Sequence, residues 1–394
     1  MLTLLLTRAW FARIWILQEV ALATKIVVIC GGQQASWKAI ARFLKAMDRD
    51  SRLPREWFHA WNLITFRKEY RQRKETGGVD IYSALIQART CFATNRRDKV
   101  YALLGVCDEL ARAIGVPDYN LPVVEVWTQA FKACLESKMS INSLSLVTGA
   151  PVSLALPSWV PDLCQHRKNW ICRPRPIDEL DGTPRFKHCT SPLGDSLLVW
   201  CDVVDEVKIK FSFATEADSL LTTWRQWWAE YCRGHPISQT LQTDWISVFW
   251  AAALGDVYES FTTGPTLLTW HQQFLDGLYD NPPSELGAVL LNEIPDILGL
   301  SQSRRVLGQT TSNRLGLFEH EVAIGDKIIL LSGATTPYVV RHIKVWRQDG
   351  GHYVLSSSSN YPYYKLIGPC FVSGLMSSNS KPASTEGYKE MILA

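Results

Sequence analysis

The sequence lacks the short motifs that mark a nucleotide site or a triad hydrolase. No G-x-G-x-x-G or G-K-[S/T] occurs, and no G-x-S-x-G is present. The Gly31-Gly32 pair, which follows the strand-like KIVVIC, therefore predicts a turn and not a phosphate-binding loop. The eight histidines are scattered along the chain, so no Ser-His-Asp or Cys-His arrangement can be specified. We expect no bound cofactor.

Clustered charge and long apolar runs are also missing. A formal net charge of +3 is too small to predict a nucleic-acid or anionic-membrane partner. The one basic run, FRKEYRQRKE at 66–75, interleaves acidic residues at helical spacing, as a solvated helix face does. The longest apolar stretches, such as 246–255, are well short of the roughly 20 residues that span a bilayer. We expect a cytoplasmic protein with no nucleic-acid partner and no membrane span.

The spacing of the cysteines does not indicate a disulfide framework. The ten cysteines are scattered and several lie in apolar runs, which indicates buried, reduced thiols and not a disulfide framework. One stretch gathers potential zinc ligands, but its spacings match no Cys-x-x-Cys or His-x₃₋₅-His scheme, and we expect no metal site. These residues are Cys164, His166, Cys172, His188 and Cys189.

What the sequence does have is sixteen tryptophans and an unusual N-terminal block, WFARIWILQEVALATKIVVICGG. Its apolar residues form two stripes on one helix, which predicts a helix buried on more than one side. Gln18 projects between the stripes, and a buried amide without partners costs about 1–3 kcal/mol. Arg13, Gln18 and Glu19 thus indicate either a hydrogen-bond network or a site in which Glu19 handles a proton; the residues alone favour the network. KIVVIC predicts a strand covered on both faces of an α/β sheet.

Two polar residues stand where helices are expected to begin. Ser36 can cap a helix that extends through Met47, and Asp80 can cap another that extends through Thr90.

The remaining patterns predict an α+β, mixed fold in successive blocks. Cys201, Val203 and Val207 alternate with polar residues, which predicts a half-buried strand able to pair with the C-terminal strands. Arg97 and Asp98 are expected to form an ion pair. The expected divisions are a helix plus strand at 1–48, a helical region at 49–150, a proline-rich connection at 151–192, the half-buried strand at 193–213, a helical insertion at 214–303, a β-rich module at 304–376 and a disordered tail at 377–394.

Several blocks together resemble a known family. RAWFARIWILQEVALA with CGGQQASW, then ATNRRDKVYALLGV with PDY after it, then LPSWVPD, look like fungal heterokaryon-incompatibility (HET) domain proteins. NRLGLFEHEVAIGDKIILLSGATTPYVVR and YYKLIGPCFVSGLM look like the strand-rich module that often closes them. The segments that normally open the domain, reading like LSYCWG and IDALCINQ, are not found. The resemblance therefore implies a chain that starts inside the domain, as a truncated gene model or a natural short paralogue.

The resemblance implies a role in fungal nonself recognition and programmed cell death, with self-association or an incompatibility partner. The HET domain has been compared with the flavodoxin-like TIR fold, so a remnant of that fold is expected. Two alternatives stay open: an NAD-cleaving or other nucleotide enzyme with Glu19 as the catalytic candidate, and an inactive truncated paralogue. The residues that match family motifs are Trp10, Arg13, Trp15, Gln18, Glu19, Arg97, Asp98, Tyr101, Leu104, Gly105, Trp159, Pro161 and Asp162.

Overall fold

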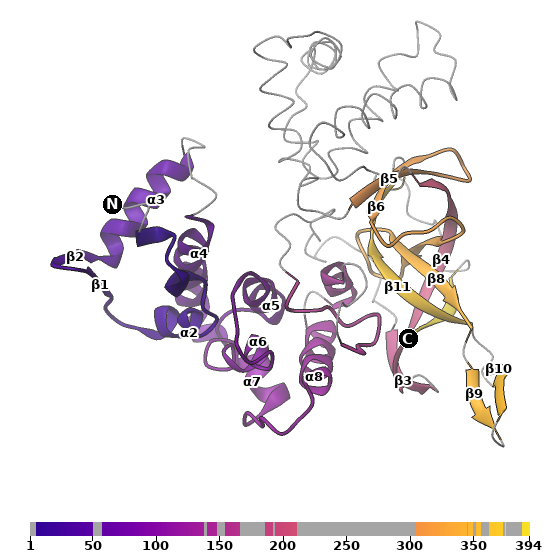
Figure 1. Cartoon of the computed structure of the whole chain (residues 1–394), viewed down its shortest axis with the longest axis horizontal. Coiled ribbons are helices and arrows are strands. Elements are labelled where there is room, and N and C mark those ends of the chain that lie inside the picture. The colour runs from indigo at the N-terminus through magenta and orange to yellow at the C-terminus, as the bar shows by residue number, and fades with distance from the viewer. Residues whose placement is uncertain are drawn as a thin grey trace, which may run out of the picture. The chain divides into compact units, whose positions relative to one another are not determined.

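The chain has a mixed α+β fold, with helices in its N-terminal part and a mostly antiparallel sheet in its C-terminal part (Figure 1). It divides into two compact units, a helical unit (1–143, 153–156 and 162–167) and a sheet unit (144–152, 157–161 and 168–394). The expected helical insertion at 214–303 lies outside the described residues. The structure is a computed structural model that describes residues 5–49, 57–137, 140–147, 154–165, 186–191, 194–210, 305–344, 346–349, 352–355, 362–372, 375 and 388–394.

Two helices of the helical unit begin at a capping side chain. Oδ1 of Asp80 accepts the Ser83 N–H at 2.9 Å, and Oγ of Ser36 accepts the Ala39 N–H at 3.2 Å. Both caps were predicted from the sequence. The elements are η1 (Ala9–Ala12), α2 (Trp15–Leu22), β1 (Val27–Cys30), β2 (Gln33–Ser36), α3 (Trp37–Arg49), α4 (Phe58–Arg73), η3 (Lys74–Thr76), α5 (Ile81–Thr90), α6 (Asp98–Tyr101), α7 (Asp108–Ile114), α8 (Val123–Glu136) and η4 (Ser140–Leu146).

The prediction of one continuous N-terminal helix is wrong, because the chain breaks at Arg13. Arg13 has extended backbone angles, φ −74° and ψ 136°, between η1 and α2. Phe92 supplies the reason: its carbonyl accepts the Ile14 N–H at 2.9 Å, and its own N–H donates to the Ala12 carbonyl at 2.6 Å. These bonds to a distant segment replace the helical bonds that the break gives up.

The prediction that KIVVIC is covered on both faces is also wrong. β1 pairs with β2 in an antiparallel hairpin, and no other described strand joins it. Ile29 is 72% exposed and Val27 is 45% exposed. A strand in a two-stranded ribbon has no sheet neighbours to carry covering helices, so its apolar side chains stay in solvent. The predicted turn is present, with Gly31 at φ 58°.

The sheet unit is organised around one long strand, β4. β4 pairs with β3, β13, β7 and β5 along its length, and β7 returns to it through β8, β11 and β13, so that five of the strands close a ring. Pairing is antiparallel except between β11 and β13. The strands are β3 (Phe186–Ser191), β4 (Gly194–Lys210), β5 (Arg305–Thr310), β6 (Leu315–Glu319), β7 (Lys327–Leu331), β8 (Tyr338–Ile343), β9 (Trp346–Asp349), β10 (His352–Leu355), β11 (Tyr363–Pro369), β12 (Phe371–Val372) and β13 (Lys389–Leu393).

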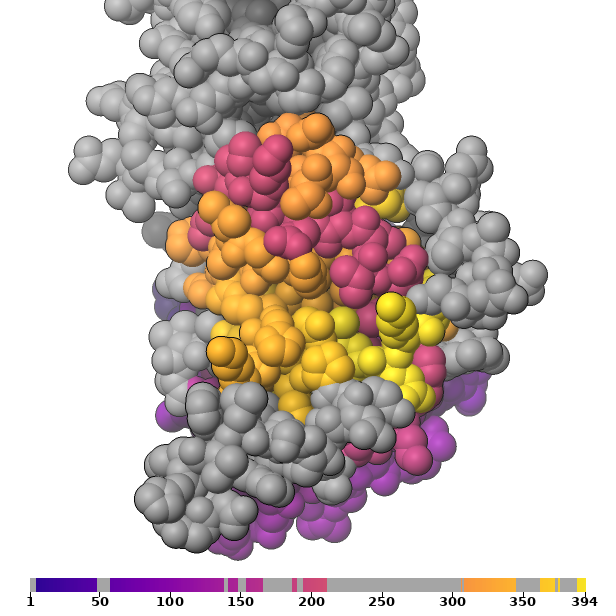
Figure 2. Space-filling model, turned by 90° about the vertical axis from the view of Figure 1, so that its right-hand side faces the viewer, coloured from indigo at the N-terminus to yellow at the C-terminus, as the bar shows by residue number. Residues whose placement is uncertain are grey.

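The predicted alternation in β4 holds at Cys201 and Val207, which are buried, and fails at Val203, which is 46% exposed. The register against β7 shifts between Val203 and Asp205, so Val203 lies at an irregularity of the ladder. Figure 2 shows one face of this unit, on which β4 lies among strands from beyond residue 304.

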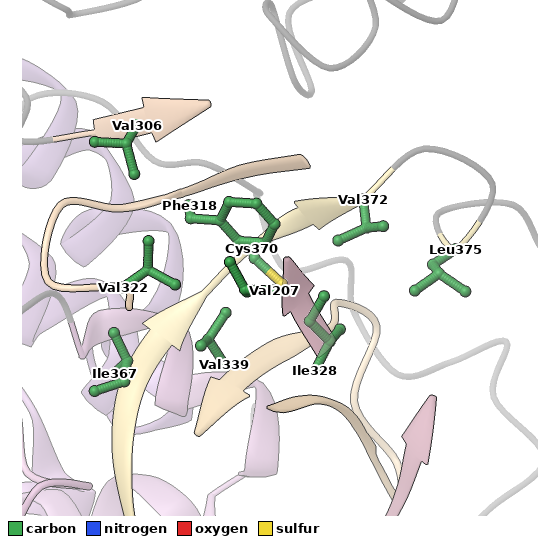
Figure 3. Packing of buried hydrophobic residues seen from close by; sticks show 10 residues of the cluster. All are labelled: Val207, Val306, Phe318, Val322, Ile328, Val339, Ile367, Cys370, Val372 and Leu375. Carbon is green, nitrogen blue, oxygen red and sulfur yellow. The ribbon is translucent and has the colours of Figure 1, made fainter. Parts of the chain in front are cut away.

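The core of the sheet unit is built around Phe318 (Figure 3). Its ring occupies the space beside two glycines: a Cβ added at Gly316 would lie 2.3 Å from the ring, and one at Gly308 would lie 3.1 Å from it. Absent side chains on neighbouring strands thus make room for one large ring. The cluster consists of Val207, Val306, Phe318, Val322, Ile328, Val339, Ile367, Cys370, Val372 and Leu375.

The expectation of a disordered tail is wrong for its last residues. β13 pairs with β4 and β11, and its residues Met391, Ile392 and Leu393 are buried. The apolar run MIL follows the serine-rich and lysine-rich stretch, and it closes the ring of strands. Composition over the whole tail concealed this short strand, because its polar residues outnumber its apolar ones.

Candidate functional site

Two motif blocks of the helical unit are joined at the carboxylate of Asp98. The Trp15 indole N–H donates to its Oδ2 at 3.1 Å, and the Tyr119 hydroxyl donates to its Oδ1 at 2.8 Å. Asp98 is only 9% exposed. Each of its oxygens accepts a hydrogen bond, so this buried polar group has a partner on both sides. We call Trp15, Gln18, Arg97, Asp98, Tyr101, Gly105 and Tyr119 the Asp98 junction.

The loop between α7 and α8 is held against α6 by three side chains of the junction. The Tyr101 hydroxyl donates to the Asp118 carbonyl at 2.7 Å, and Nε of Arg97 donates to the Leu121 carbonyl at 2.6 Å. The rings of Tyr101 and Tyr119 meet edge to face at 5.2 Å. The expected ion pair between Arg97 and Asp98 is replaced, because each side chain binds a different segment.

The side chain of Gln18 packs directly against Gly105. A Cβ added at Gly105 would lie 2.4 Å from Nε2 of Gln18 and 2.8 Å from its Cδ. Only glycine leaves room for the amide at this distance, so two family-motif residues are explained by one contact. Leu104, the neighbouring motif residue, is half-buried.

The other motif residues of the first block do not join the junction. Glu19 and Arg13 are exposed, and Trp10 is 38% exposed with its ring edge-to-face against Phe11 at 5.0 Å. The sequence therefore grouped Arg13, Gln18 and Glu19 as one polar feature, whereas only Gln18 lies in the network. The N-terminal helix carries its polar connection mainly through Trp15.

Two buried cations donate hydrogen bonds to the last carbonyls of helices. The sequence did not single out either of them. Arg67 donates to the carbonyls of Val20 and, at 2.8 Å, Ala23, at the end of α2. Lys99 donates to the carbonyl of Ala88 at 2.7 Å and to that of Cys91, at the end of α5. Cations there satisfy carbonyls that have no helical partner.

The interpretation of 66–75 as a solvated face is thus wrong for Arg67, which is 7% exposed. Burial, and then the neighbouring Arg71 guanidinium, lower the pKa of Arg67. Burial likewise lowers the pKa of Lys99, while the nearby thiols of Cys164 and Cys91 act in the opposite direction. A charge pattern read along one helix could not reveal that a basic side chain reaches the end of another helix.

The third motif block, LPSWVPD, places its residues in both units. Trp159 is fully buried in the sheet unit, where its indole N–H donates to the Asp195 carbonyl at 3.4 Å, and Pro161 is buried. The neighbouring Ser158 donates its N–H to the Ala394 carbonyl at 3.0 Å. Asp162 belongs to the helical unit, and its Oδ1 accepts the Cys164 N–H at 2.8 Å. These residues fix the backbone of the connecting segment.

Two of the buried carboxylates in the sheet unit, Asp205 and Asp326, bind neighbouring loops, and the sequence did not single them out. Asp205 accepts hydrogen bonds from the Thr311 hydroxyl at 2.8 Å and the Ser312 N–H at 3.2 Å, and thereby orders the turn between β5 and β6. Asp326 accepts two hydrogen bonds from Arg341, at 2.8 and 2.9 Å. A bidentate geometry of this kind fixes both partners. These carboxylates shape loops of the sheet.

The raised pKa values of several cysteine thiols and of Tyr119 have burial as their main cause. Burial raises the pKa of Cys91 and Cys107 to about 11 and that of Cys134 and Cys201 to about 12, so these thiols are poor nucleophiles. Desolvation and the Asp98 carboxylate raise the pKa of Tyr119 to about 12. Among the described residues no group of three or more His, Cys, Asp or Glu side chains could hold a metal ion. Two of the five potential zinc ligands named above, His166 and Cys172, lie outside the described residues.

Comparison with known proteins finds a distant similarity to a heterokaryon-incompatibility protein. The chain is similar to heterokaryon incompatibility protein 6, OR allele, of Neurospora crassa, with 28% identity over 190 residues. The match covers 39% of this chain and only 28% of the Neurospora protein, so it relates the two distantly. No family model matches the chain, and no solved structure matches it significantly. In the parts of the chain that are described, no helix is long and apolar enough to cross a membrane.

Proposed function

We propose that this chain is a signalling or interaction protein of heterokaryon incompatibility, which acts in fungal nonself recognition and triggers growth arrest and cell death through protein partners. The observation that carries the proposal is the distant similarity to the Neurospora incompatibility protein, and the Asp98 junction is consistent with it. Motif residues that stand 83 positions apart, Trp15 and Asp98, meet in one hydrogen bond. The motifs are thus accounted for as the framework of one folded unit.

The junction has the chemistry of a structural connection. Both Asp98 oxygens accept donors, and Arg97 and Tyr101 are engaged with backbone carbonyls. Side chains that make their hydrogen bonds to other segments of the protein hold those segments together. A role in positioning a protein surface fits this better than a role in bond making.

An NAD-cleaving activity centred on Glu19 draws no support from the position of that residue. Its side chain is exposed on α2, apart from the junction. A catalytic carboxylate is expected in a partly enclosed site, where its pKa and geometry are controlled. NAD turnover by the purified chain that disappears in Glu19→Gln would establish the enzyme alternative. The inactive-paralogue alternative predicts neither turnover nor a growth phenotype.

The test is inducible expression of the full chain in Neurospora crassa, with hyphal growth rate and vital-dye uptake as readouts. The proposal predicts slower growth and more dead compartments after induction. The matched control is Asp98→Asn, brought to the same abundance, which disrupts the junction. Normal growth and viability at high abundance of the unaltered chain would contradict the proposal.

A further inference from the structure

The strand β1 presents two exposed apolar side chains on the helical unit, Val27 and Ile29. Val27 and Ile29 lie on the same face of the strand, because alternate residues of a strand share a face, and Ile29 is 72% exposed. β1 pairs with β2 on one side, and no other described strand pairs with it on the other (Figure 1). A two-stranded hairpin is marginally stable alone, and an unpaired apolar edge is a template for a further strand.

The register of the hairpin determines which backbone groups face that edge. Cys30 and Gln33 flank a two-residue loop, so they form a hydrogen-bonded pair, and hydrogen-bonded and non-hydrogen-bonded pairs then alternate along the ribbon. The alternation makes Ile26 and Trp37 a hydrogen-bonded pair, and the Trp37 N–H does donate to the Ile26 carbonyl at 3.2 Å. The register is therefore consistent from the loop to the base of the hairpin.

Val27 and Ile29 occupy the non-hydrogen-bonded positions opposite Ser36 and Gln34. Their N–H and C=O groups point away from β2, towards the outer edge of β1. The edge thus offers two N–H donors, two carbonyl acceptors and two exposed apolar side chains, in one row. These backbone groups and side chains are what a further strand needs in order to pair with the edge.

We propose that a second copy of this chain pairs with this edge, with the two β1 strands antiparallel and Val28 on the two-fold axis. In this register Val27 lies opposite Ile29 of the second copy, so residues with outward backbone groups meet each other. Apolar side chains also face apolar ones, because the edge is self-complementary. The product is a four-stranded sheet in the order β2-β1-β1-β2.

The charges near the hairpin permit this pairing. Residues 26–37, IVVICGGQQASW, contain no charged residue and no proline, the usual protections of a strand edge. Lys25 would lie opposite Gly31 of the second copy, which has no side chain. The two Lys25 residues would stand six residues apart, or roughly 20 Å. That is more than twice the Debye length of about 8 Å at physiological ionic strength, so their repulsion is screened.

The assembly closes at two copies and is weak. Pairing about a two-fold axis uses both β1 edges, and the outer strand becomes β2, whose Gln33 and Gln34 are polar and whose Ser36 caps α3. Strands of four residues bury much less than the about 1,200 Å² of total surface typical of a stable complex. The dimer should therefore form in proportion to concentration, as a device that responds to abundance.

This inference names one partner for the proposed interaction function and takes its biological meaning from it. The test is sedimentation velocity on the purified full chain over a wide concentration range. We expect the mass to rise from one chain to two with concentration, and Ile29→Lys to weaken association by about tenfold or more. The matched control is Ile324→Lys, at a 70% exposed position in the sheet unit, which should associate normally. A single-chain mass throughout, or unchanged association of Ile29→Lys, would overturn the proposal.

A second experiment locates the axis independently of any effect of the lysine on folding. Across the proposed interface Val28 faces its own copy in a non-hydrogen-bonded pair, with Cα atoms about 4.5 Å apart, within the range of a disulfide. Oxidation with copper phenanthroline should yield a covalent dimer of Val28→Cys. Gln34→Cys on β2 and the unaltered chain, which carries Cys30, should stay largely monomeric. Equal cross-linking of all three would refute the register. Both readouts use purified protein, so their failure is distinct from failure of the growth assay.

Discussion

The indole nitrogen of Trp15 lies 3.1 Å from Oδ2 of Asp98, and this hydrogen bond joins α2 to α6 across 83 positions of the chain. The Tyr119 hydroxyl completes the arrangement at 2.8 Å from Oδ1. A short helix of eight residues such as α2 has little stability of its own, so tertiary contacts of this kind determine where it lies. The Asp98 junction is therefore the expected weak point for mutation in the helical unit.

Asp98→Asn should destabilise the helical unit. An amide keeps one acceptor oxygen but places an NH₂ against either the Trp15 or the Tyr119 donor, which leaves a donor unsatisfied at a cost of about 1–3 kcal/mol. Urea unfolding followed by tryptophan fluorescence measures the change. The exposed Asp108→Asn is the control and should cost less than about 1 kcal/mol. Equal effects of the two variants would mean that the junction contributes nothing specific.

Tyr119 should make stability fall at alkaline pH. The pKa of its hydroxyl is about 12 in the folded protein, against an ordinary value of about 10, so the folded state retains the proton longer. Its contribution is complete below pH 10 and is lost as pH rises from 10 towards 12. The difference in free energy of unfolding between wild type and Tyr119→Phe should therefore be constant from about pH 7 to 9 and shrink above about pH 10. A difference that grows with pH would show that the sign is wrong.

Gly105→Ala should be costly only while Gln18 is present. The new Cβ would lie 2.4 Å from Nε2 of Gln18, the movable end of a side chain, so we expect about 0.5–1.5 kcal/mol. In a Gln18→Ala background the cost should vanish, which a double-mutant cycle measures directly. Gly78→Ala gives the contrast, since it combines φ +81° with a Cβ 2.2 Å from the Val106 carbonyl oxygen. It should cost about 2–4 kcal/mol whatever residue stands at 18.

Arg67→Met should destabilise more than Arg71→Met, although both arginines reach the end of α2. Arg67 is buried and donates to three carbonyls, whereas Arg71 is exposed and donates to two. Loss of the buried donor leaves carbonyls unsatisfied, at about 1–3 kcal/mol, and loss of the exposed one admits water, at less than about 0.5 kcal/mol. Chemical unfolding of both variants supplies the comparison, and similar values would contradict the assigned role of burial.

The sequence predicts local features here better than it predicts their environment. The caps at Ser36 and Asp80, the turn at Gly31 and the strand at 197–210 follow from local chemistry, and all are present. The break at Arg13 could not be predicted, because it depends on Phe92, nearly 80 residues away. The exposure of Ile29 was missed for a related reason: a β-branched run indicates a strand but not how many strands surround it.

The candidate site shows the same division. The resemblance identified Trp15, Gln18, Asp98 and Gly105, and the structure places them in two pairs, Trp15 with Asp98 and Gln18 with Gly105. It could not separate them from Glu19, which lies one position from Gln18 but faces solvent. Tyr119 was within reach, since it ends the PDY segment, whereas the burial of Arg67 depends on packing between two helices and has no signature in sequence.

The measurement that tests the central claim most directly compares Asp98→Asn with Glu19→Gln in the fungal growth and viability assay, at matched protein abundance. The account holds that the motifs build an interaction surface supported by the Asp98 junction. It predicts that Glu19→Gln arrests growth like the unaltered chain and that Asp98→Asn does not. Loss of growth arrest in Glu19→Gln, together with full activity of Asp98→Asn, would contradict it and direct attention to chemistry at Glu19.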